Sequence, residues 1–358
     1  MDEIKFAEVI GDVSNIKKVY WGTAPTGVIH LGYALPLLLI CQMLDAGVEV
    51  IILLADMHAM LDSLKTTAEL VESRCIYYET TLKTLLTLLG ANTTKLSFVR
   101  GSSFQLSRNY TFDVYKMQTL ITEHDAKKAG TEVVKQTDNP KLSSLTYPVL
   151  QALDEVYLKV DAELGGQDQR KIFTFASKYL PKIGYKPIVH LMNPMLPSLA
   201  TSVKCDGDNQ QAKSNKMSSS DAANSKITFT DTTEQLDKKI RKSFCEDKNV
   251  DDNPLLAYYE HIVIPLNKRL RLVSTFNNTT TNINGDDNSS DKLVSVAAND
   301  VDDDMTDIET LTENFKQGLV LPQQLKGTVK HVLESFLSMT RLAFNTEEYL
   351  SLVKNAYP

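Results

Sequence analysis

The apolar run at residues 48–54 constrains the fold of this chain more than any other segment. It has the length of a strand, and its nearly continuous apolar character is typical of a parallel strand that is buried on both faces. An apolar strand at residues 18–21, a tight turn at residues 22–27 and an apolar helical segment ending at Gly47 precede it. Strand, helix and strand in this order predict a βαβ unit, in which Pro36 marks a kink or a late start of the regular helix.

The alternation of helices and strands continues along the chain. Residues 66–90 have the periodicity of a long helix, and residues 95–99 predict another strand. We therefore expect an α/β fold for residues 1–232, a Rossmann-like domain built on an open, doubly wound parallel sheet. In such a sheet the ligands bind beyond the carboxyl ends of the strands.

From about residue 232 the pattern predicts helices only. Asp231 and Glu234 have the spacing of a capping box, and Asn253-Pro254 predicts a capped helix start with a first-turn proline. Residues 233–358 are therefore expected to form a mostly α-helical domain. Within it, a segment at about 275–304, rich in Asn, Thr, Ser and Asp, predicts an insertion at the surface.

Composition favours a folded, cytoplasmic enzyme. The 358 residues are 42% hydrophobic and 23% charged, the N-terminus lacks a secretory signal, and no apolar stretch approaches the roughly 20 residues that cross a bilayer. The four cysteines form no CxxC pair, which argues against zinc or disulfides. A net charge of -7 counts mildly against nucleic-acid binding, although the basic clusters at 238–242 and 268–271 could face RNA as well as solvent.

Two motifs suggest phosphate chemistry. Gly27, His30 and Gly32 lie where the first strand turns into the first helix, and a helix N-terminus there offers free N–H groups, to which the histidine can add a donor. Residues 216–220, Lys-Met-Ser-Ser-Ser, place a cation and three hydroxyls on a polar loop that could stabilise a pyrophosphate leaving group. Taken singly, the first motif also fits an ordinary turn and the second a plain linker.

Together, and in this order, the two motifs resemble the paired signatures of class I aminoacyl-tRNA synthetases. A third segment identifies the branch. Tyr147, Gln151 and Asp154 are spaced by four and three residues, so they share one helix face. With the Gly-Gly-Gln-Asp-Gln-Arg-Lys segment at 165–171, they are similar to the tyrosine pocket of archaeal and eukaryotic tyrosyl-tRNA synthetases.

The resemblance implies a tyrosine–tRNA ligase that activates L-tyrosine with ATP, its Mg²⁺ carried by the phosphates, and loads tRNA(Tyr). It also implies a homodimer, joined through a connective segment at about 95–145, and no membrane association. Tyr20 and Asp154 would bind the phenol, and Tyr147, Gln151 and Gln169 the amino group. The implied catalytic residues are His30 and, in the loop 213–221, Lys216, Ser218, Ser219 and Ser220. The implied ATP contacts are Gly22, Pro25, Thr26, Gly27, His30, Gly32, Asp168, Lys216 and Met217. The tRNA acceptor end would meet Lys128, Arg170 and Lys171, and no protein ligand to a metal is implied.

The sequence departs from the family pattern at two places. The loop at 201–215 is longer than usual, and Gln324 stands where the family's anticodon region usually has an aspartate. Two alternatives stay open: a tryptophanyl-tRNA synthetase, against which Tyr20 and Asp154 argue, and a non-catalytic RNA-binding or signalling relative. We also expect no additional C-terminal RNA-binding module.

Overall fold

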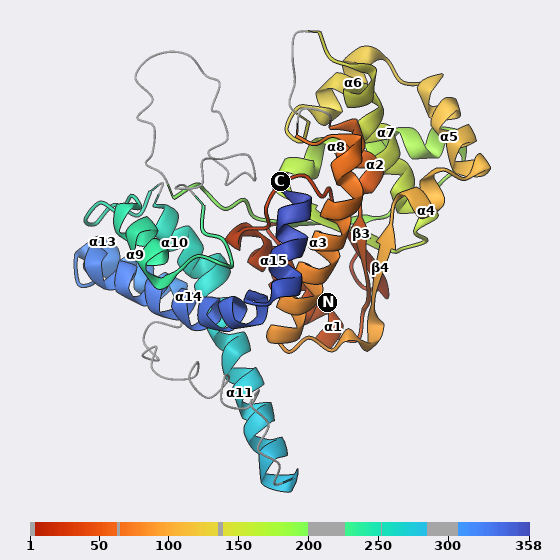
Figure 1. Ribbon diagram of the computed structural model, residues 1–358. Coiled ribbons are helices and arrows are strands. Elements are labelled where there is room, and N and C mark those ends of the chain that lie inside the picture. The colour runs from red at the N-terminus through yellow and green to blue at the C-terminus, as the bar shows by residue number, and fades with distance from the viewer. Residues whose placement is uncertain (1–3, 63–64, 135–138, 200–225, 252, 285–306) are drawn as a thin grey trace.

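The computed structural model describes residues 4–62, 65–134, 139–199, 226–251, 253–284 and 307–358 (Figure 1). Within these ranges a six-stranded sheet has the order β1-β6-β5-β2-β3-β4. Its strands are β1 (Glu8–Ile10), β2 (Lys18–Thr23), β3 (Glu49–Leu54), β4 (Leu96–Arg100), β5 (Ala162–Gly166) and β6 (Val189–Asn193). The helices are α1 (Ala34–Asp45), α2 (Asp56–Leu61), α3 (Ala68–Leu88), α4 (Ser102–Gln105), α5 (Arg108–Gln118), α6 (Glu123–Gly130), α7 (Leu142–Tyr157), α8 (Arg170–Tyr179), α9 (Thr233–Lys242), α10 (Pro254–Tyr258), α11 (Ile264–Asn284), α13 (Ile308–Gln317), α14 (Pro322–Phe344) and α15 (Glu347–Ala356).

The predicted α/β class is confirmed, with one addition at the sheet edge. Strands β2, β3, β4, β5 and β6 pair in parallel, whereas β1 pairs antiparallel with β6, with Val9 opposite Leu191. Sequence analysis did not predict β1, because three partly exposed residues are too few to show a periodic pattern.

Strand β3 is buried on both faces, as its apolar run predicts. Successive side chains of a strand point to opposite faces. Val50, Ile52 and Leu54 therefore join the core that contains α1 and α3, whereas Ile51 and Leu53 pack with Tyr20 of β2 on the other face. Helix α1 begins only at Ala34, so Pro36 lies in its first turn and marks a late start rather than a kink.

Helix α9 begins one residue later than its sequence suggested. Thr232 is the N-cap: its hydroxyl accepts from the Gln235 backbone N–H at 3.2 Å, and the Gln235 side chain accepts from the Thr232 N–H at 2.9 Å. The predicted Asp231–Glu234 box is therefore wrong. The Asp231 carboxylate accepts the hydroxyl of Thr228 at 2.8 Å and pairs with Lys239 at 2.5 Å, so tertiary partners occupy it. The predicted Asn253 cap of α10 is confirmed.

Two helices of the C-terminal half extend away from the other helices of that half. Helix α11 runs to Asn284 and projects from the rest of the protein, so the first part of the 275–304 segment is helical; residues 285–306 lie outside the described residues (Figure 1). Helix α15 returns to α3, where the hydroxyls of Tyr349 and Thr81 are 2.9 Å apart. No helix within the described ranges is long and apolar enough to cross a membrane.

Candidate active site

A cavity of about 550 Å³ opens at the carboxyl ends of the parallel strands, where a doubly wound sheet binds its ligands. Thr23 ends β2 there, Gly166 ends β5 and Asn193 ends β6. Of the residues that the sequence predicted for the site, ten line this cavity: Tyr20, Gly22, Thr26, His30, Gly32, Tyr147, Gln151, Asp154, Asp168 and Gln169. The fold thus brings together residues that are far apart in the sequence.

One end of the cavity is formed by the turn after β2. The carbonyl of Gly27 accepts hydrogen bonds from the hydroxyls of Tyr78 at 2.7 Å and Tyr357 at 2.6 Å, and the carbonyl of Thr26 accepts from Arg74 at 2.6 Å. The turn is therefore held by α3 and by the residue that follows α15. Pro25 and Gly27 shape this turn without lining the cavity.

His30 caps the short 3₁₀ turn Leu31–Tyr33, one turn ahead of the regular helix α1. Its Nδ1 accepts the backbone N–H of Gly32 at 3.2 Å, which leaves the ring proton on Nε2. Burial, with the positive charge of Lys226 nearby, lowers the pKa of His30 to about 4. At neutral pH the ring is therefore a neutral hydrogen-bond donor at the edge of the cavity.

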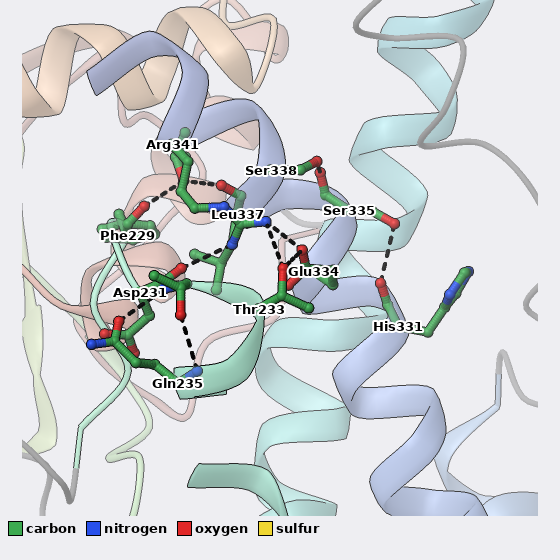
Figure 2. A network of polar contacts seen from close by, with 12 residues as sticks. Phe229, Asp231, Thr233, Gln235, His331, Glu334, Ser335, Leu337, Ser338 and Arg341 are labelled. Carbon is green, nitrogen blue, oxygen red and sulfur yellow. Dashed lines mark hydrogen bonds and ion pairs between the residues drawn. The ribbon is translucent and has the colours of Figure 1, made fainter. Parts of the chain in front are cut away.

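The backbone of His30 is paired with residues 226–231, which we name the strap. His30 forms an antiparallel bridge with Thr228, and the Leu31 N–H donates to the carbonyl of Ile227 at 2.7 Å. Helix α14 holds the other side of the strap (Figure 2). Arg341 donates to the Asp231 carbonyl at 2.8 Å and Thr340 to the Phe229 carbonyl at 2.6 Å. The strap thus connects helix α14 to His30, at the end of the cavity formed by the turn after β2.

The deep end of the cavity carries several buried polar atoms without a hydrogen-bond partner among the described residues, two of which belong to Asp154 and Tyr20. Asp154 is fully buried; its Oδ1 accepts from Gln105 Nε2 at 2.7 Å and from the Tyr110 hydroxyl at 2.8 Å. Its Oδ2 has no hydrogen-bond partner among the described residues, and neither has the buried hydroxyl of Tyr20. Burial raises the pKa of Asp154 to about 8, against the lowering effect of its two donors.

The wall beside these atoms is polar as well. Gln151 Nε2 donates to Glu163 Oε1 at 2.9 Å and lies 3.2 Å from Gln169 Oε1. The ring of Tyr147 stands edge-on to His58, with centroids 4.6 Å apart. Burial raises the pKa of Glu163 to about 8. Sequence analysis did not single out Glu163 or His58 as site residues.

Behind this wall lies the one group of three histidine and acidic side chains in the described ranges whose atoms are close enough to share a metal ion. Single atoms of Glu155, Glu163 and His190 lie within 4.8 Å of one another. His190 Nε2 is 3.0 Å from Glu155 Oε1, and its ring stacks on Phe173. Burial raises the pKa of Glu155 and lowers that of His190, which favours a neutral hydrogen-bonded pair, and we assign no metal to it.

The remaining predicted site residues are not among those that line the cavity within the described ranges. Lys216, Met217, Ser218, Ser219 and Ser220 are outside the described residues. Lys128 is exposed at the end of α6, and Arg170 and Lys171 begin α8, where they pair with Glu8 at 3.0 Å and Glu132 at 2.8 Å. Gln324 lies in the first turn of α14, and its side chain accepts the Leu321 N–H at 2.8 Å, so it caps the helix.

Comparison with known proteins identifies the family of the chain. The family described as tRNA synthetases class I (W and Y) matches residues 15–338. The cytoplasmic tyrosine–tRNA ligase of Gallus gallus is 44% identical over 344 residues, which are 95% of this chain and 58% of that protein. The probable cytoplasmic tyrosine–tRNA ligase of Encephalitozoon cuniculi is 50% identical over 248 residues, 69% of each chain. The crystal structure of a tyrosyl-tRNA synthetase from Archaeoglobus fulgidus with L-tyrosine has a TM-score of 0.72 at 31% identity, covering 92% of this chain and 91% of that one.

The chain therefore belongs to the class I tRNA synthetases for tryptophan and tyrosine. The relatives named above are tyrosine enzymes. The chain spans 58% of the length of the Gallus gallus relative.

Proposed function

We propose that this protein is a cytoplasmic tyrosine–tRNA ligase. The observation that carries the proposal is the unpaired polar end of the cavity, formed by the Tyr20 hydroxyl and Asp154 Oδ2. A buried polar atom without a partner costs about 1–3 kcal/mol. The hydroxyl of a substrate phenol supplies a partner to both, because it donates to the ionised form of Asp154 while accepting from Tyr20. An indole N–H only donates, so tryptophan would leave Tyr20 unpaired.

The rest of the cavity suits the other groups of the two substrates. The side chains of Tyr147, Gln151 and Gln169 surround the place proposed for the tyrosine ammonium. The neutral His30 donates from Nε2 to the phosphates of ATP, close to the turn at residues 22–27. Asp168 lines the cavity near β5 and is proposed to contact the ribose.

The proposed reaction has two steps. An oxygen of the tyrosine carboxylate attacks the α-phosphorus of ATP, the bond to the bridging oxygen breaks, and pyrophosphate leaves as tyrosyl-adenylate forms. A terminal ribose hydroxyl of tRNA(Tyr) then attacks the tyrosyl carbonyl, and AMP leaves. Mg²⁺ enters with the ATP phosphates, and Lys216 with Ser218, Ser219 and Ser220 is proposed to stabilise the pyrophosphate. Lys128, Arg170 and Lys171 would meet the acceptor end of the tRNA.

A homodimer is part of the proposal. Helix α5 and its neighbours expose apolar side chains that a monomer would leave in water: Leu106, Phe112, Tyr115 and Leu120. Phe112 and Tyr115 are three residues apart on one helix face and are each 61% exposed. Light scattering should detect a dimer at micromolar concentration, and a purely monomeric species would refute this part.

Exchange between ATP and labelled pyrophosphate tests the activity directly. We expect exchange that depends on tyrosine and not on tryptophan or phenylalanine. Exchange driven by tryptophan would identify the other branch of the family. If no amino acid supports exchange by the folded protein, the chain is a non-catalytic relative and the proposal fails.

A further inference from the structure

Among the described residues, Gln151 is held in the cavity wall by its amide nitrogen alone. Nε2 lies 2.9 Å from Glu163 Oε1 and 3.2 Å from Gln169 Oε1, and both of these atoms are acceptors. A primary amide has two N–H donors and one carbonyl oxygen. Because both donors are directed at oxygens of the protein, the carbonyl oxygen Oε1 is the atom left for a ligand.

The opposite orientation of the amide is disfavoured. Turning the Gln151 side chain by half a rotation would exchange its nitrogen and oxygen. Its oxygen would then face the oxygens of Glu163 and Gln169, and its N–H groups would face the ligand. The preference does not need an ionised Glu163: with the proton on Oε2, the carbonyl oxygen Oε1 still accepts from Gln151.

The backbone of Glu163 is held in the sheet, so its carboxyl group can hold Gln151 in this orientation. It lies in the middle of β5, in register with Tyr20 of β2 and with His190 of β6, and only 2% of it is exposed. Its Oε2 has no hydrogen-bond partner among the described residues, so the Gln151 amide is the partner that its geometry shows. A strand position between two parallel neighbours leaves the carboxyl little freedom to move away.

We infer that Glu163 is a positioning residue for the substrate ammonium, because it orients Gln151 so that the amide oxygen faces the amino group of tyrosine. This inference rests on the proposed function. An ammonium group carries only donors, so it binds an amide oxygen and is repelled by amide N–H groups. Glu163 therefore contributes to amino-acid recognition through Gln151.

Two substitutions separate the hydrogen bond from the ionisable carboxyl group. Glu163→Leu removes the acceptor, whereas Glu163→Gln keeps an oxygen that can accept from Gln151 and removes the ionisable group. Pyrophosphate exchange gives KM for tyrosine and for ATP. The competitive inhibitor 3-(4-hydroxyphenyl)propanoate, which is tyrosine without its amino group, reports binding of the phenol end alone.

We expect Glu163→Leu to raise KM for tyrosine about tenfold, the effect of weakening one hydrogen bond to a charged group. The KM for ATP and the inhibition constant of the analogue should stay within about twofold, a change of under half a kcal/mol. Glu163→Gln should restore most of the tyrosine affinity. In a Gln151→Met background, Glu163→Leu should raise KM no further.

Three outcomes would overturn the inference. If the analogue weakens as much as tyrosine, Glu163 supports the phenol end, through Tyr20 or through packing. If Glu163→Gln is as impaired as Glu163→Leu, the carboxyl group itself matters and not the orientation of Gln151. Additive losses in the Gln151→Met background would show that Glu163 does not act through Gln151. Thermal unfolding checks that each variant is folded, and Glu163→Met replaces Glu163→Leu if the latter is not. Absence of exchange in the parent protein would instead refute the proposed function.

Discussion

Replacing Asp154 by asparagine should narrow the preference for tyrosine over phenylalanine. The amide oxygen of Asn can take the place of Oδ1 and keep the hydrogen bonds from Gln105 and Tyr110, so the cavity wall should persist. The amide nitrogen then replaces Oδ2, the oxygen that we assign to the phenol and that accepts from it once Asp154 has lost the proton held in the free protein. An amide nitrogen cannot lose its protons in this way, so the substrate hydroxyl has no acceptor and meets a donor instead.

The size of the effect follows from the unmatched group. A buried donor without an acceptor costs about 1–3 kcal/mol, which corresponds to a fall of roughly 5- to 150-fold in kcat/KM for tyrosine. Phenylalanine makes no hydrogen bond at this position, so its kcat/KM should hardly change. Asp154→Ala should be worse for stability, because it also leaves the Gln105 amide without the acceptor it has at 2.7 Å.

Pyrophosphate exchange with each amino acid measures both kcat/KM values, and the KM for ATP serves as an internal reference. Asp237→Asn is a matched control, since Asp237 undergoes the same chemical change on α9, where it pairs with Lys330 at 2.6 Å outside the cavity. An Asp154→Asn protein that discriminates as well as the Asp237→Asn protein would refute our assignment of the phenol site.

Three further predictions concern protons, the loop and the strap. Burial raises the pKa of both Asp154 and Glu163 to about 8, so the folded state binds protons that the unfolded state releases. The stability that these two groups contribute is complete below about pH 4 and is lost as pH rises through 8. The free energy of unfolding, measured with urea, should therefore fall less steeply between about pH 4 and pH 8 for Asp154→Asn/Glu163→Gln than for the parent protein. Lys216→Ala should slow single-turnover adenylate formation far more than it weakens tyrosine binding, measured by fluorescence of Trp21, the one tryptophan, which lines the cavity; equal losses would exclude a role in the transition state. Arg341→Leu removes a hydrogen bond that holds the strap, so it should raise KM for ATP about fivefold, which corresponds to the free energy of one hydrogen bond. The KM for tyrosine should not change. An unchanged KM for ATP would show that the strap does not position His30.

The parts of the fold that sequence predicted are those set by local pattern. Strand β3 is identified by its own apolar residues, and the cap at Asn253 by its own side chain followed by a proline. The mistaken cap at Asp231 shows the limit of such patterns. Asp231 has suitable spacing, but Thr228 and Lys239 occupy its carboxylate, and Thr232 caps α9 instead.

The candidate site shows the same division. Tyr20, Gln151 and Asp154 were found because their motif resembles a family whose pocket is known. The strap was not found, because its importance depends on Arg341 and Thr340 of α14, more than 100 residues further along the chain. A backbone carbonyl can accept a hydrogen bond from a residue distant in the sequence whatever its own side chain is, so the local sequence does not predict the contact.

Glu163 is an intermediate case, because its sequence context contains half of the needed information. Its neighbours Ala162 and Leu164 are apolar and belong to one core, so alternation along β5 places the acid alone on the opposite face. An acid at the centre of a buried parallel strand needs a polar partner, since an unpaired buried carboxyl is costly. The sequence could thus have predicted a polar cavity facing β5. It could not have predicted that the partner is an amide on α7 held by its nitrogen, and it is this detail that directs the free oxygen of Gln151 toward a ligand that can only donate.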